Sequence, residues 1–112
     1  MSLSLALLLV AAAPPPEVPP GLQFGYIRMA VFQQRAKELH CGAGQLDGEF
    51  AAIRKKLVAR YGKKAFGKPK IPNGGPGDCF SALSVYRVNL ADFRKQAEAA
   101  LAAAPAAAPR KE

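Results

Sequence analysis

The sequence has few of the residues that enzymes most often use for catalysis. Its 112 residues include no tryptophan, a single histidine, His40, and only two cysteines, Cys41 and Cys79. The cysteines do not form a Cys-x-x-Cys pair, which excludes the usual thiol-exchange and haem-attachment motifs. His40 precedes Cys41 directly, but neighbouring side chains on a helix point in different directions, so this histidine is not placed to activate that thiol. We therefore predict a protein that is not an enzyme, with no catalytic residue.

Nucleotide and metal motifs are also missing. The glycines of residues 42–48 come close to Gly-x-Gly-x-x-Gly, but the last glycine is displaced by one position and no strand precedes them. The glycines of residues 73–78 lack the Lys-Ser/Thr pair that would hold a nucleotide. His40, Cys41, Asp78 and Cys79 do not have the paired spacing of a structural zinc site. The sequence thus predicts no metal site and no cofactor.

The leading apolar run, residues 3–13, is too short to span a membrane. As a helix it would measure about 17 Å, against roughly 30 Å of hydrocarbon. It ends in Val10, Ala11 and Ala12, small residues typical of a signal-peptidase site. We predict a signal peptide over residues 1–12 and a periplasmic or secreted protein, although no basic residue follows Met1 and Pro14 lies close to the cut. The alternative is a disordered apolar tail.

The rest of the chain divides into one small domain with flanking segments of biased composition. A proline-rich spacer is predicted over residues 13–21, a folded domain over 22–102, and a disordered alanine-rich tail over 103–112. A domain of this size has a poor ratio of core to surface. A disulfide between Cys41 and Cys79 would close a loop of about 39 residues and add about 4 kcal/mol in the chain-entropy model. We expect this disulfide to form.

Apolar residues recur at helical spacing in three segments. The spacing predicts helices over residues 23–39, over 47–61 with Asp47 as its cap, and from Asp78, again as a cap, to residue 101. The β-branched and aromatic residues of 84–88 leave open a short extended piece followed by a shorter helix capped by Asn89. The predicted fold class is all-α, a small three-helix domain with one disulfide.

The net charge of +8 is confined to one segment. Between residues 54 and 70 there is no acid, while the rest of the chain holds eight basic and eight acidic residues. Such a segment attracts anionic partners. The predicted anion-binding residues of this basic segment are Arg54, Lys55, Lys56, Arg60, Lys63, Lys64, Lys68 and Lys70.

Two apolar residues among these lysines, Phe66 and Ile71, suit insertion into an anionic lipid surface. Phe66 or Tyr61 stacking on a base would suit nucleic acid. We predict a non-enzymatic binding or accessory domain that contacts an anionic envelope component, namely lipid, polysaccharide or an acidic protein. The alternative is a cytosolic nucleic-acid-binding protein, if the leader is not cleaved. The charges can also serve only to keep a small domain soluble.

Overall fold

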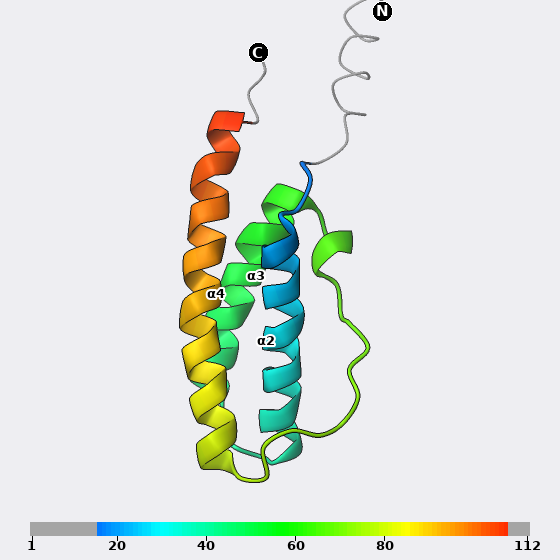
Figure 1. Ribbon diagram of the computed structural model, residues 1–112, viewed down its shortest axis with the longest axis vertical. Helices are drawn as coiled ribbons and strands as arrows, with labels where there is room; N and C mark the ends of the chain where they lie inside the picture. The colour runs from blue at the N-terminus through cyan, green and yellow to red at the C-terminus, as the bar shows by residue number, and fades with distance from the viewer. Residues whose placement is uncertain (1–15, 108–112) are drawn as a thin grey trace, which may run out of the picture.

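The computed structural model describes the chain over residues 16–107, with side chains described over 16–103. The predicted signal peptide, residues 13–15 of the spacer and residues 108–112 of the tail lie outside this range. The described chain forms three long helices side by side (Figure 1), namely α2 (Pro20–Glu38), α3 (Gly44–Tyr61) and α4 (Cys79–Ala107), with a short 3-10 helix, η1 (Lys64–Phe66). No strand occurs among these residues. The predicted all-α, three-helix class is confirmed.

Helix α2 begins and ends with residues suited to those positions. Pro20 occupies its first turn, where a missing N–H costs nothing because that group has no helical partner. At the other end the N–H groups of His40 and Cys41 bond back to the carbonyls of Lys37 and Ala36, at 3.1 and 2.9 Å. These two bonds form a Schellman motif, which requires a left-handed residue. That residue is His40, with φ 55°.

Helix α3 begins at Gly44, so the prediction that Asp47 caps it is wrong. Asp47 lies in the first turn, and its N–H bonds to the Ala43 carbonyl at 2.8 Å. Its Oδ1 accepts instead from the Tyr86 hydroxyl of α4, at 2.6 Å, and from Gln33 Nε2 of α2, at 3.2 Å. Tyr86 is fully buried and its hydroxyl needs an acceptor. This contact between helices therefore takes the carboxylate that a local cap would have used.

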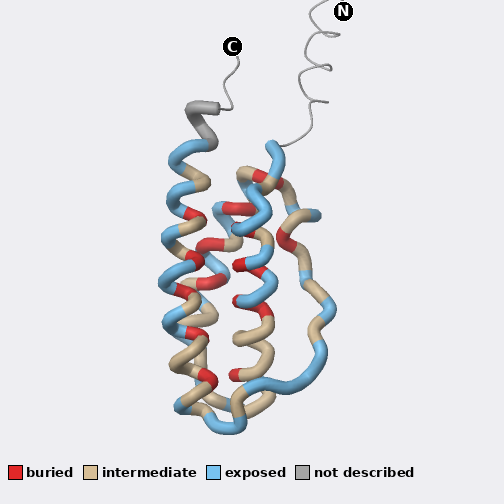
Figure 2. Tube along the Cα trace, in the orientation of Figure 1, coloured by how far each residue is buried: buried red, intermediate tan, exposed pale blue. Residues whose placement is uncertain are grey.

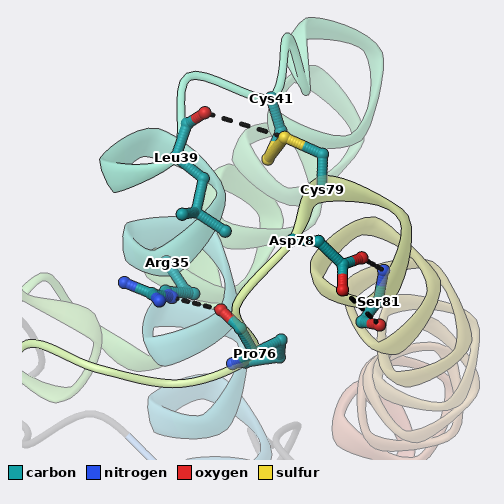
Figure 3. Close-up of a disulfide and its surroundings, with 7 residues drawn as sticks. All are labelled: Arg35, Leu39, Cys41, Pro76, Asp78, Cys79 and Ser81. Carbon is teal, nitrogen blue, oxygen red and sulfur yellow. Dashed lines mark hydrogen bonds between the residues drawn. A yellow bond between two sulfur atoms is a disulfide. The ribbon is translucent and has the colours of Figure 1, made fainter.

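Helix α4 begins as predicted. Asp78 Oδ1 accepts from the Ser81 backbone N–H at 2.8 Å, which is the N-cap bond (Figure 3). Residues 84–88 continue the helix, so the extended alternative is excluded. Burial decides this, because the most buried positions of α4 follow a helical spacing and are Ala82, Tyr86, Leu90, Phe93 and Ala97. The helix ends at Ala107, beyond the predicted 101, and so includes residues 103–107 of the predicted tail.

The core lies between the inner faces of the three helices, where buried residues line up (Figure 2). Tyr26 of α2 contacts the rings of Phe50 and Phe66, with centroid distances of 5.6 and 5.1 Å. Phe50 contacts Phe93 of α4 at 5.9 Å. Gly25 lets α2 approach α4 closely, since a Cβ there would stand 3.1 Å from the Phe93 ring. Within residues 16–107 no helix combines the length and apolarity needed to cross a bilayer.

The predicted disulfide is present. Cys41, after the end of α2, is bonded to Cys79, the first residue of α4, with their Cα atoms 5.3 Å apart (Figure 3). Cys79 Sγ also lies 3.6 Å from the Leu39 carbonyl oxygen, a contact without a proton because disulfide sulfurs carry none. The bridge joins the two ends of a ring of chain that contains α3, η1 and the segment between η1 and α4.

Candidate functional site

The segment from Gly67 to Asp78, here called the strap, follows α2 along the outside of the bundle. It runs in the same direction as α2, from η1 to the disulfide (Figure 1). Side chains of α2 hold its start. The Tyr26 hydroxyl lies 2.9 Å from the Phe66 carbonyl oxygen and 2.8 Å from that of Gly67, and Gln23 Nε2 donates to the Ala65 carbonyl at 2.9 Å. The entry into the strap is thus tied to the bundle by its main-chain carbonyls.

The second half of the strap is held in the same way. Gln34 Nε2 lies 3.3 Å from the Ile71 carbonyl oxygen, and Arg35 Nε donates to the Pro76 carbonyl at 2.6 Å (Figure 3). Gly75 has φ 134° and passes so close to Arg35 that a Cβ would stand 3.1 Å from its Cγ. Bonds from side chains of α2 therefore give a defined path to a segment rich in glycine and proline.

Glu38 supports these two donors of α2. Its carboxylate accepts from Arg35 Nη1 at 2.9 Å and from Gln34 Nε2 at 3.1 Å. The hydrogen bond from Arg35 holds the pKa of Glu38 below its ordinary value. Glu38 is therefore charged at neutral pH and helps to orient the side chains that bond to the strap.

The six lysines of the basic segment are exposed, but they do not share one face. Lys55 and Lys56 are neighbours on α3 and so point in different directions. Lys56 lines a groove between α3 and α4 together with Glu49, Glu98 and Arg94. The remaining four lie close together in the chain, at the entry to η1 and on the strap, and we call them the strap lysines: Lys63, Lys64, Lys68 and Lys70.

The two arginines of the basic segment are half-buried. Arg54 Nε donates to the Phe66 carbonyl at 2.7 Å and to the Tyr26 hydroxyl at 3.2 Å. Arg54 thus holds the start of the strap against α2 and α3, and its Nε is not available to a partner. Sequence reasoning did not separate this structural arginine from the exposed lysines, because both count equally as charge.

The aromatic residues of the basic segment are not at the surface. Phe66 is 0% exposed and Tyr61 is 6% exposed. The predicted insertion of Phe66 into lipid, and the predicted stacking of Phe66 or Tyr61 on a base, are therefore wrong. The 3-10 turn directs Phe66 inward, where its ring packs edge-on against Tyr26. The Phe66 ring also lies 6.1 Å from the Tyr61 ring and belongs to the core.

A groove of about 660 Å³ lies between the strap, α2 and the start of α3. We call it the strap groove. Apolar walls from residues such as Ala30 and Ile71 alternate with six side chains that carry polar or charged groups: Gln33, Gln34, Lys37, His40, Asp47 and Lys68. Only Lys68 among them was predicted as a site residue. The others could not be found from the sequence, because they come from three elements and no motif joins them.

Asp47 is fixed at the groove by its bonds to Tyr86 and Gln33. Burial of the Tyr86 ring, together with the hydrogen bond to Asp47, raises the pKa of Tyr86 far above its ordinary value. The phenol is therefore protonated at any physiological pH and acts as a permanent donor to Asp47 Oδ1. His40, at the same groove, has no thiol to activate, because Cys41 beside it is in the disulfide.

No protein-family model matches the chain, and no curated protein and no solved structure matches it. Among the described residues, no three histidine, cysteine or acidic side chains come together as a metal site. The exposed strap lysines and the strap groove lie beside each other in the described chain, and Lys68 belongs to both.

Proposed function

We propose that this is an exported, non-enzymatic binding domain that contacts an anionic component of the cell envelope through the strap lysines. One observation carries the proposal. Four exposed lysines lie within eight residues, on backbone that α2 holds in place, in a segment without acids. Fixed backbone reduces the entropy lost on binding, so the charges act together at lower cost than on a mobile loop.

Charge, rather than apolar insertion, makes the contact. Tyr61 and Phe66 are buried, so the basic segment presents no exposed aromatic ring to lipid or to a base. Attraction between exposed charges is screened by salt, with a decay length of about 10 Å at 0.1 M. Binding should therefore weaken steeply as salt rises. The same geometry disfavours single-stranded nucleic acid, whose binding proteins combine basic grooves with stacking rings.

The export that this proposal requires has two supports. Residues 1–12 have the composition of a signal peptide. The Cys41–Cys79 disulfide suits an oxidising compartment, such as the periplasm or the extracellular space. Anionic headgroups and anionic polysaccharides both face such compartments, and both bring the phosphate or carboxylate groups that lysine side chains attract.

The test is binding to vesicles of phosphatidylglycerol, to polygalacturonate and to single-stranded DNA over a series of salt concentrations. The strap variant replaces all four strap lysines by glutamine. Each lysine near an anionic surface contributes about 1 kcal/mol, so we expect at least a ~10-fold loss of affinity for the anionic envelope probe. The matched control removes four charges elsewhere, with Lys55, Lys56, Arg87 and Lys95 changed to glutamine, and should retain most of the affinity.

Two results would overturn the proposal. Equal losses in the strap variant and the control would mean that net charge alone drives binding and that the strap has no special part. Salt-dependent retention of single strands only, by a full-length cytoplasmic protein with free thiols, would favour the nucleic-acid alternative.

A further inference from the structure

The strap groove has the size and position of a ligand site beside the strap lysines. Its volume of about 660 Å³ lies within the range of roughly 300–1,000 Å³ that is usual for small-molecule sites. Its walls come from α2, the strap and the start of α3, three elements joined to one another by hydrogen bonds. A ligand in it would touch the strap and the bundle together.

Two cations lie at this groove on different elements. Lys37 belongs to α2 and Lys68 to the strap, and both side chains are exposed. Nothing in the sequence connects them, since 31 positions separate them. Two ammonium groups from two walls suit a carboxylate or phosphate group, which accepts hydrogen bonds from several donors at once.

Hydrogen-bond acceptors line the same groove. The amide nitrogens of Gln33 and Gln34 already donate within the fold, Gln33 to Asp47 and Gln34 to the strap and Glu38. The Asp47 Oδ2 atom takes no part in the bonds that Tyr86 and Gln33 make to Oδ1. The side-chain oxygens of Gln33 and Gln34 and the Asp47 Oδ2 atom can therefore accept hydrogen bonds from a ligand. A simple inorganic anion offers few donors, whereas a sugar that carries an acidic group offers hydroxyls as well as the negative charge.

The groove is also held in shape before any ligand arrives. The buried Tyr86 phenol fixes Asp47, and Asp47 fixes Gln33. Gln34 and Arg35 fix the strap, and the disulfide closes the end of the groove at Cys41. His40 lines that end in a left-handed conformation, at a position where glycine would satisfy the turn without strain. A ligand contact would give this histidine a role that the turn itself does not require.

We propose that the strap groove binds an anionic sugar unit, with its carboxylate or phosphate between Lys37 and Lys68 and its hydroxyls on Asp47 and the two glutamines. The inference deepens the proposed function, on which it rests, by naming an anionic polysaccharide as the envelope component. The strap lysines then contact the neighbouring charges of the same polymer.

The test is a titration of the full chain, followed by NMR signals of Gln33, Gln34 and His40 and by calorimetry. The probes are trigalacturonate, glucose 6-phosphate, neutral galactotriose and inorganic phosphate. We expect one or both acidic sugars to shift these groove signals, galactotriose to leave them unchanged, and phosphate to bind at least ~10-fold more weakly than the better acidic sugar. Binding of trigalacturonate would indicate a polymer with carboxylate groups, and binding of glucose 6-phosphate a polymer with phosphate groups.

The variant that isolates the groove is Lys37→Gln, because Lys37 lies outside the basic segment and on an exposed helix position. Loss of one charged hydrogen bond should lower the affinity for the acidic sugar by about tenfold. The control Lys95→Gln removes the same charge from α4, which does not line the groove, and should bind as wild type. Lys68→Gln repeats the test from the other wall.

The outcomes separate this inference from the proposed function. If neither acidic sugar shifts the groove signals, or if Lys37→Gln and Lys95→Gln behave alike, the groove assignment is wrong, whatever the strap variant does on vesicles. Phosphate binding as tightly as the acidic sugars would overturn the sugar class. If the acidic sugar binds in the groove, and a strap variant that keeps Lys68 (Lys63, Lys64 and Lys70 changed to glutamine) behaves on polygalacturonate like its charge-matched control (Lys55, Lys56 and Lys95 changed to glutamine), only the proposed function of the strap fails.

Discussion

At the scale of single residues, the backbone of His40 is the most unusual feature of the described chain. A non-glycine residue in the left-handed region carries a steric cost of about 1 kcal/mol, which glycine does not. We predict that His40→Gly raises the free energy of unfolding by about 0.5–1 kcal/mol, measured from urea denaturation. His40→Ala keeps the Cβ and its strain and is the control. A glycine variant no more stable than the alanine variant would show that the turn carries no strain.

The same variant separates stability from binding. If His40 contributes to the strap groove, His40→Gly should be more stable and yet bind the acidic sugar more weakly. Residues that cost stability and serve a ligand behave in this way. A variant that is more stable and binds equally well would leave the turn without a functional reason.

Two aspartates show how far prediction reaches at this scale. Asp78 and Asp47 were both predicted as helix caps from the same signal, an acidic residue before an apolar repeat. Asp78 caps α4, whereas Asp47 turns to Tyr86, 39 positions away. A cap is a local bond and can be predicted from neighbouring residues. The buried phenol that takes Asp47 is placed by the packing of three helices, which no local pattern reveals.

At the scale of the elements, two glycines within helices test the packing of α2 against α4. Gly48 lies on the exposed side of α3, where an added Cβ meets nothing within 4 Å. We predict that Gly48→Ala stabilises the protein by about 0.5–1 kcal/mol through helix propensity. Gly25→Ala has the same propensity gain, but its Cβ would stand 3.1 Å from the buried Phe93 ring, so the gain should be lost or reversed. Thermal denaturation of both variants gives the difference.

An equal gain at the two positions would contradict the close approach of α2 and α4. It would mean that the Phe93 ring moves aside without cost. The comparison needs no absolute stability, because both substitutions change the same residue type within a helix and differ mainly in what the new methyl group meets.

The strap is the element that the sequence predicted least well. Its charge was recognised, but not its path, because the bonds that hold it run from side chains of α2 to main-chain carbonyls. Such bonds leave no periodic pattern. Phe66 was assigned to the surface since lysines surround it in the chain, whereas it is part of the core. The groove was missed altogether, because Lys37 and Lys68 line one groove only once the strap is in place.

At the scale of the whole molecule, the fold class and the disulfide were predictable because both depend on strong and simple signals. Three apolar repeats at helical spacing leave little choice of class. Two cysteines leave one pairing. The disulfide also joins the end of α2 to the start of α4, so that α3, η1 and the strap lie within one covalently closed loop. The stability of the domain and the shape of the groove should therefore depend on the same bond.

The last prediction concerns that bond. The two cysteines are 38 positions apart, and closing a loop of about that length contributes about 4 kcal/mol in the chain-entropy model. Domains of this size have total stabilities of about 5–15 kcal/mol. The double variant Cys41→Ser, Cys79→Ser should therefore unfold at a much lower urea concentration than the oxidised wild type. A reducing agent should lower the urea midpoint of the wild type to nearly that of the variant and leave the midpoint of the variant unchanged.

The disulfide also closes the end of the groove at Cys41. Binding of the acidic sugar should therefore weaken in the double variant even where the variant is still folded. An unchanged midpoint on reduction would mean that the hydrogen bonds from α2 to the strap hold the ring closed without the disulfide.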